Sequence, residues 1–257
     1  METQTASPVA TPPTDPPAAG ARLEDVTRRY GAVTAVEHLS LAVAPGEVVA
    51  VVGPSGCGKS TLLQLVCRLE APDAGRVEAG PAALMPQRDL LLPWATALDN
   101  APLPLRLHGA SRREARAAAA PLFETFGLGG FERARPAQLS GGMRQRVAFL
   151  RTLLAGKPVL CLDEPFAALD ALARSDMQAW LAGALAREPR TVLLVTHDVE
   201  EAVVLADRVV VLSPRPGRVV AEIRVDAPRP RRATDAAVVA CRAEALAALG
   251  RTGGAPA

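Results

Sequence analysis

The sequence is poor in lysine, in aromatic residues and in long apolar runs. Lysine occurs only at positions 59 and 157 among 29 basic residues, and aromatic residues make up 3% of the chain. No apolar run reaches the roughly 20 residues that a helix needs to cross a bilayer, which argues against a membrane channel. The net charge of +2 and the dispersed arginines argue against a nucleic-acid-binding protein, whose basic residues would form one patch.

Cysteine is also scarce, and its spacing is informative. Cys57, Cys67, Cys161 and Cys241 are far apart and form no CxxC pair, which indicates a reducing compartment and no metal site. Residues 1–20 hold five prolines, no basic residue and no apolar core of a signal peptide, so we predict a disordered tail there. With 49% hydrophobic residues in 257, the chain can bury a sizeable core.

One glycine-rich segment connects an apolar run at 48–52 to apolar residues that recur at helical spacing from 62 to 69. It matches GxxxxGKS, a loop whose backbone N–H groups surround a polyphosphate and which therefore needs small residues. The predicted phosphate-binding residues are Gly53, Pro54, Ser55, Gly56, Cys57, Gly58, Lys59, Ser60 and Thr61. Lys59 would reach the terminal phosphates and Ser60 would bind magnesium. A glycine-rich turn without function is the alternative, which the complete motif disfavours.

Two adjacent carboxylates follow a second apolar strand, predicted over 159–162. Asp163 and Glu164 would repel each other there unless a cation or a proton shares the site, and the magnesium of a bound nucleotide would provide the cation. Because neighbouring side chains of a strand point to opposite faces, one carboxylate can anchor the metal while the other orients or deprotonates water. An exposed acidic turn is the alternative.

A histidine follows a third apolar strand, predicted over 191–195. Ligands bind at the carboxyl ends of parallel strands, so we expect His197 in the same crevice as Lys59 and Asp163, although a lone histidine is often structural. Tyr30, the only tyrosine, could stack on a base or simply occupy a turn.

Other segments predict the surroundings of this crevice. Partly alternating segments at 23–26 and 35–43 indicate an antiparallel layer, and two strands near 208–212 and 218–223 flank a tight turn. A final alanine-rich helix is expected after residue 232. Between 95 and 138 the pattern is helical, with a capping box from Ser111 to Glu114, and we expect breaks or kinks at Pro102, Pro104 and Pro121. The apolar segment 90–94 is either a partly exposed docking surface or a buried anchor.

A further glycine motif decides among phosphate-loop proteins. Leu139-Ser140-Gly141-Gly142 opens a predicted helix and by itself could be an anion-binding helix end or a simple cap. Its place between the phosphate loop and Leu162-Asp163-Glu164-Pro165 resembles the signature of the ATP-binding subunits of ABC transporters. The resemblance covers roughly residues 23–232.

The resemblance implies a fold and a division into domains. The fold would be α/β, with a P-loop NTPase core of the RecA-like kind, an antiparallel β layer and an inserted α-helical subdomain. Residues 21–90 and 143–225 would form the ATP-binding core and residues 91–142 the helical subdomain with the signature. Residues 226–257 would be a C-terminal extension.

The resemblance also implies roles for single residues. Tyr30 would stack on adenine, the phosphate loop would hold ATP and Mg²⁺, and Gln87 would sense the γ-phosphate and the metal. Asp163 would support magnesium, Glu164 would be the base toward water, and His197 would contact the γ-phosphate. Ser140, Gly141 and Gly142 would act on the nucleotide of a second subunit, and Asp170 would lie in the loop through which the subunits communicate.

Partners and location follow from the same resemblance. The expected assembly is a head-to-tail homodimer at the cytoplasmic face of the plasma membrane, bound to a transmembrane permease that segment 90–107 contacts and, indirectly, to a solute-binding protein. The segments around 91–100 and 212–218 are similar to importers of nitrate, sulfonates and taurine, whereas 149–154 is similar to importers of thiamine pyrimidine precursors. Ala167 in place of a glycine, the short stretch 75–87, and Pro102 and Pro104 depart from the family pattern.

Three alternative functions fit the sequence less well. A P-loop small-molecule kinase has no use for the Leu-Ser-Gly-Gly motif. A GTPase would need an Asn-Lys-x-Asp motif, whereas Lys157 is followed by Pro158. An ABC ATPase without a transport role, such as a DNA-repair protein, would carry a long coiled-coil insertion for which 257 residues leave no room.

Overall fold

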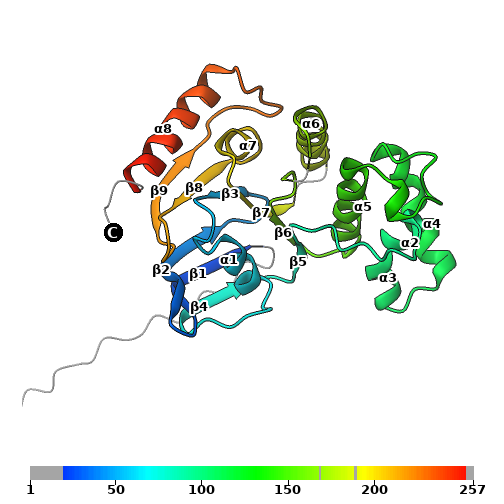
Figure 1. Cartoon of the computed structure of the whole chain (residues 1–257), viewed down its shortest axis with the longest axis horizontal. Helices are drawn as coiled ribbons and strands as arrows, with labels where there is room; N and C mark the ends of the chain where they lie inside the picture. Colours follow the sequence, from blue (N-terminus) through cyan, green and yellow to red (C-terminus); the bar gives the residue numbers. More distant parts are fainter. Residues whose placement is uncertain (1–19, 168, 188–189, 253–257) are drawn as a thin grey trace, which may run out of the picture.

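The computed structural model describes residues 20–167, 169–187 and 190–252, so the predicted tail lies outside the described residues except for Gly20. A large sheet with helices on both faces forms the centre, a smaller antiparallel sheet lies beside it, and a group of helices projects to one side (Figure 1). No helix within the described ranges is both long and apolar enough to span a membrane.

The large sheet has the strand order β5-β6-β7-β3-β8-β9. Its strands are β3 (Val48–Val52), β5 (Ala82–Met85), β6 (Val159–Asp163), β7 (Thr191–Thr196), β8 (Arg208–Leu212) and β9 (Val219–Arg224). The first five strands in this order, β5, β6, β7, β3 and β8, are parallel, and β9 pairs antiparallel with β8. The strands that the sequence predicted at 48–52, 159–162 and 191–195 are thus confirmed as neighbours in one sheet.

Each central strand contributes to two hydrophobic cores, because successive side chains point to opposite faces. Val49 and Val51 of β3 face the core that contains α1 (Lys59–Val66), whereas Ala50 and Val52 face the core with the other helices. This second core takes in α6 (Ala171–Arg187), α7 (Val199–Leu205) and α8 (Ala236–Thr252). Burial on both faces explains why these strands read as continuous apolar runs.

The antiparallel sheet has the order β2-β1-β4, with β1 (Ala21–Tyr30), β2 (Val33–Val43) and β4 (Ala74–Ala79). Its buried side chains, such as Leu23 and Leu39, join the core around α1. The predicted antiparallel layer is therefore confirmed, and it carries Tyr30 at the end of β1.

The projecting helices comprise α2 (Ala97–Asn100), α3 (Leu103–Leu107), α4 (Arg112–Thr125) and α5 (Gly141–Leu154), with a 3₁₀ turn at Pro136–Gln138. The predicted capping box of Ser111 and Glu114 begins α4. Pro102 and Pro104 lie at the start of α3, where a missing N–H costs nothing. At Pro121, where a break or a kink was expected, α4 does not break, because the helix continues through this residue; a kink there stays a prediction. The predicted domain boundary at 142/143 falls inside α5.

The segment after β9 is fastened to the core by one arginine. Arg231 is 8% exposed and donates hydrogen bonds to the carbonyl oxygens of Val203 (3.1 Å), Val225 (3.0 Å), Ala227 (2.8 Å) and Ala206. The carbonyls of Val203 and Ala206 lie at the end of α7. The last carbonyls of a helix have no partner within the helix, so Arg231 supplies donors that they would otherwise lack. The predicted final helix, α8, then packs on α7 and β9.

Candidate functional site

The phosphate loop connects the carboxyl end of β3 to α1. Lys59 is buried, and its Nζ donates to the carbonyl oxygens of Gly53 (2.8 Å) and Pro54 (3.1 Å). Gly56 and Gly58 have φ of +77° and +97°, in the left-handed region that favours glycine. A side chain at Gly58 would also lie too close to β2. The loop therefore presents backbone N–H groups and the positive end of α1 to one cavity.

Glu164 stands one residue past the end of β6, and its φ is +44°. The two carboxylates have different partners, as expected, but strand alternation is not the reason, because Glu164 lies outside the strand with a left-handed φ. The backbone N–H of Glu164 donates to the carbonyl oxygen of Val195 at 2.9 Å. Its Oε2 lies 3.2 Å from Nε2 of Gln87 and 3.2 Å from Nδ1 of His197. Three strand ends thus converge on one carboxylate.

Asp163 is the other member of the acidic pair. Burial raises the pKa of Asp163, a hydrogen bond with Ser60 lowers it, and the charges of Glu164 and Lys59 act in opposite senses. A half-buried carboxylate beside a hydroxyl is an oxygen donor set of the kind that Mg²⁺ accepts together with phosphate oxygens. The described residues contain no group of three or more His, Cys, Asp or Glu side chains that could hold a metal without such help.

A cavity of about 650 Å³ opens at this edge of the sheet. Ten of its lining residues were predicted from the sequence: Tyr30, Ser55, Gly56, Gly58, Lys59, Ser60, Thr61, Gln87, Glu164 and His197. Three were not predicted: Val33, Ala35 and Arg215. Gly53, Pro54 and Cys57 of the phosphate loop and Asp163 at the end of β6 do not line the cavity. The phosphate loop therefore faces Gln87, Glu164 and His197, which come from the ends of three other strands.

The signature residues lie elsewhere. Ser140 caps α5, its exposed Oγ accepting from the backbone N–H of Met143 at 3.2 Å, and Gly141 and Gly142 form the first turn of that helix. Asp170 accepts from the backbone N–H of Ala173 at 2.9 Å at the start of α6. None of these four predicted residues lines the cavity. Within one chain, the structure does not bring them to the phosphate loop.

Arg215 is a cavity residue that sequence reasoning missed. It belongs to the turn between β8 and β9, and its Nε donates to the carbonyl oxygen of Gly56 at 3.0 Å. The turn itself was predicted, but 159 positions separate the two residues. The contact exists because β8 pairs with β3, so that the segments after these two strands meet.

A buried acid behind His197 was also missed. Glu201 of α7 is 4% exposed, and its Oε1 has no hydrogen-bond partner in the described part of the chain. Burial raises the pKa of Glu201 to about 8, and the charge of Asp198 adds to this effect. Asp198 caps α7 and pairs with Arg174 at 3.6 Å. No sequence pattern indicates this burial, because acidic residues in the first turn of a helix are usually exposed.

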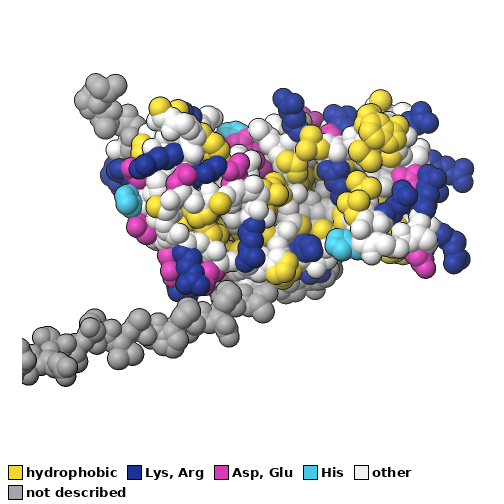
Figure 2. Space-filling view, turned by 90° about the horizontal axis from the view of Figure 1, so that it is seen from below, with side chains coloured by type: hydrophobic (Ala, Val, Ile, Leu, Met, Phe, Trp, Pro, Cys, Tyr) yellow, Lys and Arg dark blue, Asp and Glu magenta, His cyan; other side chains and the backbone are white. Residues whose placement is uncertain are grey.

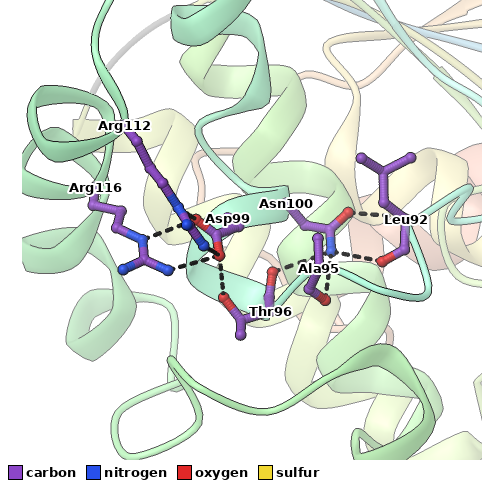
Figure 3. A network of polar contacts seen from close by, with 7 residues as sticks. All are labelled: Leu92, Ala95, Thr96, Asp99, Asn100, Arg112 and Arg116. Carbon is purple, nitrogen blue, oxygen red and sulfur yellow. Dashed lines mark hydrogen bonds and ion pairs between the residues drawn. The ribbon is translucent and has the colours of Figure 1, made fainter.

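The segment 90–100 is both exposed and firmly held. Leu90 and Trp94 are 61% and 71% exposed, whereas Leu91 is buried, so the segment is partly exposed and partly anchored, and its role as a docking surface stays a prediction. Hydrophobic side chains are visible among basic ones on the surface of the projecting helices (Figure 2). Asn100, which is fully buried, accepts from the backbone N–H of Leu92 at 2.7 Å and donates to its carbonyl oxygen at 3.1 Å (Figure 3).

The neighbouring Asp99 holds this segment to α4. Its carboxylate receives two hydrogen bonds each from Arg112 and Arg116, with N···O distances of 2.7–2.9 Å, and one from Thr96 (Figure 3). These hydrogen bonds hold the pKa of Asp99 well below its usual range, and the largest effect comes from Arg112. The hydrogen bonds of Asp99 and Asn100 therefore hold the exposed segment against the helices behind it.

The fold and this cavity define a P-loop nucleotide-binding protein of the α/β class. A family model described as ABC transporter matches residues 36–167. The chain is 47% identical over 206 residues to the formylaminopyrimidine import ATP-binding protein ThiZ of Halalkalibacterium halodurans, covering 79% of this chain and 83% of the relative. It is 45% identical over 237 residues to the aliphatic sulfonates import ATP-binding protein SsuB 1 of Rhodococcus jostii, covering 90% and 93%.

A solved structure agrees with these sequence comparisons. The dimeric structure of MJ0796, a bacterial ABC transporter cassette, superposes with a TM-score of 0.72 at 29% identity, covering 81% of this chain and all of that chain. The chain therefore belongs to the ABC transporter family, as an ATP-binding subunit with an ATPase fold. The predicted family and fold class are confirmed.

Proposed function

We propose that this chain hydrolyses ATP to drive an importer of a small organic solute through closure and reopening of a dimer. The observation that carries the proposal is the convergence of Gln87 and His197 on Glu164, across one cavity from Lys59. A carboxylate aligned by two side chains from other strands suits a hydrolytic role, whereas a binding module needs only the phosphate loop.

The phosphate loop would bind the nucleotide. Lys59 and the loop N–H groups would contact the phosphates, with Ser60 and Thr61 at the start of α1. Tyr30 is 41% exposed and lines the cavity, which supports stacking on adenine. The guanidinium of Arg28 lies 4.9 Å from the centre of the Tyr30 ring. Such a cation held against the ring would help to fix its orientation.

Hydrolysis would depend on Glu164 as the base toward water. Its carboxylate is 17% exposed and shares one oxygen between Gln87 and His197, so its orientation is set before a substrate arrives. Asp163, Ser60 and Gln87 would hold Mg²⁺, whose charge would offset that developing on the phosphates. His197 would donate a hydrogen bond to the γ-phosphate.

The signature would act across a dimer. Ser140 is exposed at the start of α5, and the N–H groups in the first turn of a helix have no partner within the helix, which suits a phosphate bound by another subunit. The absence of these residues from the cavity of their own chain supports a composite site, with Asp170 beside it. The dimeric state named for MJ0796 agrees with this arrangement.

The relatives support a class of solute and a membrane partner. ThiZ, SsuB 1 and the taurine import protein TauB of Burkholderia pseudomallei, which is 44% identical over 207 residues, are named for import of organic nitrogen or sulfur compounds. We assign this chain to the same group of importers. The exposed Leu90 and Trp94 would contact a permease, which would hold the subunit at the cytoplasmic face of the plasma membrane.

Substitution of the proposed base tests this function. Glu164→Gln should lower ATP turnover by on the order of 10²–10⁴ while ATP binding persists, because only the proton acceptor is lost. Glu244→Gln, an exposed position on α8, serves as the control and should leave turnover unchanged. Turnover of Glu164→Gln close to that of the unmodified protein would rule out the assigned base.

A second variant tests the composite site. Glu164→Gln should form dimers in the presence of ATP in size-exclusion chromatography, because bound ATP is not consumed. Adding Ser140→Arg should abolish these dimers by placing a bulky cation at the start of α5. If the double variant still dimerises with ATP, the signature residues do not meet the nucleotide of the partner.

A further inference from the structure

We propose that Arg215 contacts the phosphate chain of the bound nucleotide as a second cationic residue beside Lys59. The inference rests on the proposed ATP-binding function, because ATP is taken as the ligand. It assigns a binding role to the turn 213–217 between β8 and β9, which lies outside the phosphate loop, the acidic pair and the signature.

The turn is fixed directly against the phosphate loop. The backbone N–H of Gly217 donates to the carbonyl oxygen of Ala35 at 2.9 Å, and that of Glu37 donates to the carbonyl oxygen of Gly217 at 3.1 Å. A Cβ at Gly217 would lie 2.0 Å from the carbonyl oxygen of Cys57, so only glycine permits this approach. The hydroxyl of Ser213 closes the turn by donating to the carbonyl oxygen of Pro216 at 2.8 Å. The position of Arg215 is therefore set in advance by the fold.

The guanidinium of Arg215 is held at one end and has donors left at the other. Nε donates to the carbonyl oxygen of Gly56 at 3.0 Å, and Nη2 lies 2.7 Å from the point where a Cβ of Gly56 would be. Among the described residues, no carboxylate forms an ion pair with Arg215 within 4.0 Å. Because Arg215 lines the cavity, its Nη1 and Nη2 groups can donate to a ligand there.

The charge of the cavity favours a phosphate as that ligand. Lys59 and Arg215 supply two positive charges to the lining and Glu164 one negative charge. Nucleoside triphosphates carry several negative charges, and guanidinium groups match phosphate oxygens in geometry as well as in charge. The hydrogen bond to Gly56 would also let the turn respond to the shape of the phosphate loop.

Arg218 of the same turn region offers a matched control. It is also an arginine, but its guanidinium pairs with Glu37 on β2 and does not line the cavity. Removing either arginine changes the net charge of the protein equally. Only the removal of Arg215 changes the charge that faces the ligand.

Nucleotide affinity measures the contact without requiring turnover. Binding of ATP, ADP and adenosine would be compared for the full chain and for Arg215→Ala, Arg215→Lys and Arg218→Ala, by competition with a fluorescent ATP analogue. Arg215→Ala should weaken ATP and ADP about tenfold, the scale of one lost charge-assisted hydrogen bond. Arg215→Lys should recover part of this loss. Adenosine binding and all affinities of Arg218→Ala should change less than about twofold on the same scale.

Salt dependence gives a second readout. The ATP affinity of the unmodified chain should fall more steeply with ionic strength than that of Arg215→Ala, because an ionic contact is screened by salt. Equal salt slopes, an equal loss for adenosine and ATP, or an equal effect of Arg218→Ala would each overturn the proposal. Lys59→Ala distinguishes failure of the Arg215 contact from failure of the proposed ATP site. If the unmodified chain binds ATP and Lys59→Ala does not, an ATP affinity of Arg215→Ala equal to that of the unmodified chain refutes the arginine contact alone.

Discussion

Replacing Glu201 by glutamine should make the protein more stable above neutral pH. Glu201 is 4% exposed, and burial raises its pKa from 4.5 in the unfolded chain to about 8. Between these values the folded state binds more protons than the unfolded state, so the free energy of unfolding falls as pH rises from about 4.5 to 8. Each pKa unit corresponds to about 1.4 kcal/mol, so a shift of about 3.5 units gives a loss on the order of 5 kcal/mol by pH 8.5.

The charges around Glu201 set the direction of this effect. Asp198 and Glu164 raise the pKa, whereas a hydrogen bond with Thr196 and the charge of Arg174 lower it. Glutamine keeps a hydrogen-bonding group of the same shape but cannot ionise. Glu201→Gln should therefore match the unmodified protein near pH 4.5 and exceed its free energy of unfolding by a few kcal/mol at pH 8.5.

Urea unfolding followed by circular dichroism at several pH values would measure the difference directly. The difference between variant and unmodified protein removes the contribution of all other titrating groups. Glu200→Gln, on the same helix but with a side chain 43% exposed, should show no such growth with pH. If Glu201→Gln is equally stable or less stable at pH 8.5, Glu201 is not a buried acid that folding forces toward its neutral form.

Three further changes test the structure around the site. Asp99→Asn should lower the free energy of unfolding by about 1–3 kcal/mol at neutral pH. Unfolding curves should show that this deficit shrinks as pH falls below about 4, because the low pKa of Asp99 stabilises the fold only at pH values where the carboxyl of the unfolded chain is also ionised. Asn100→Ala should cost about 2–4 kcal/mol by leaving the buried backbone of Leu92 unpaired, and it should speed proteolysis near Trp94. Arg231→Met should leave four carbonyls without their donor and increase hydrogen exchange in α8, measured by mass spectrometry, with Arg232→Met, an exposed neighbour, as the control.

The sequence alone determined the elements that carry local signals. The phosphate loop, the apolar strands at 48–52, 159–162 and 191–195, and the capping box at Ser111 are set by residue type and spacing, which local backbone chemistry requires. The place of His197 in one crevice with Lys59 was also predictable, because parallel strands bring their carboxyl ends to one edge, whereas Gln87 was expected there only from the family resemblance. The roles assigned to these residues stay predictions.

Other features were decided by the tertiary structure. Pro121 was expected to break or kink a helix, but packing of Ala115, Ala119 and Phe123 into the core keeps α4 continuous across it. Glu164 left its strand because a left-handed turn, bonded to β7, follows Asp163. The approach of Arg215 to Gly56 depends on which strands are neighbours. Local sequence fixes the ends of strands, whereas the order of strands in the sheet fixes which ends meet.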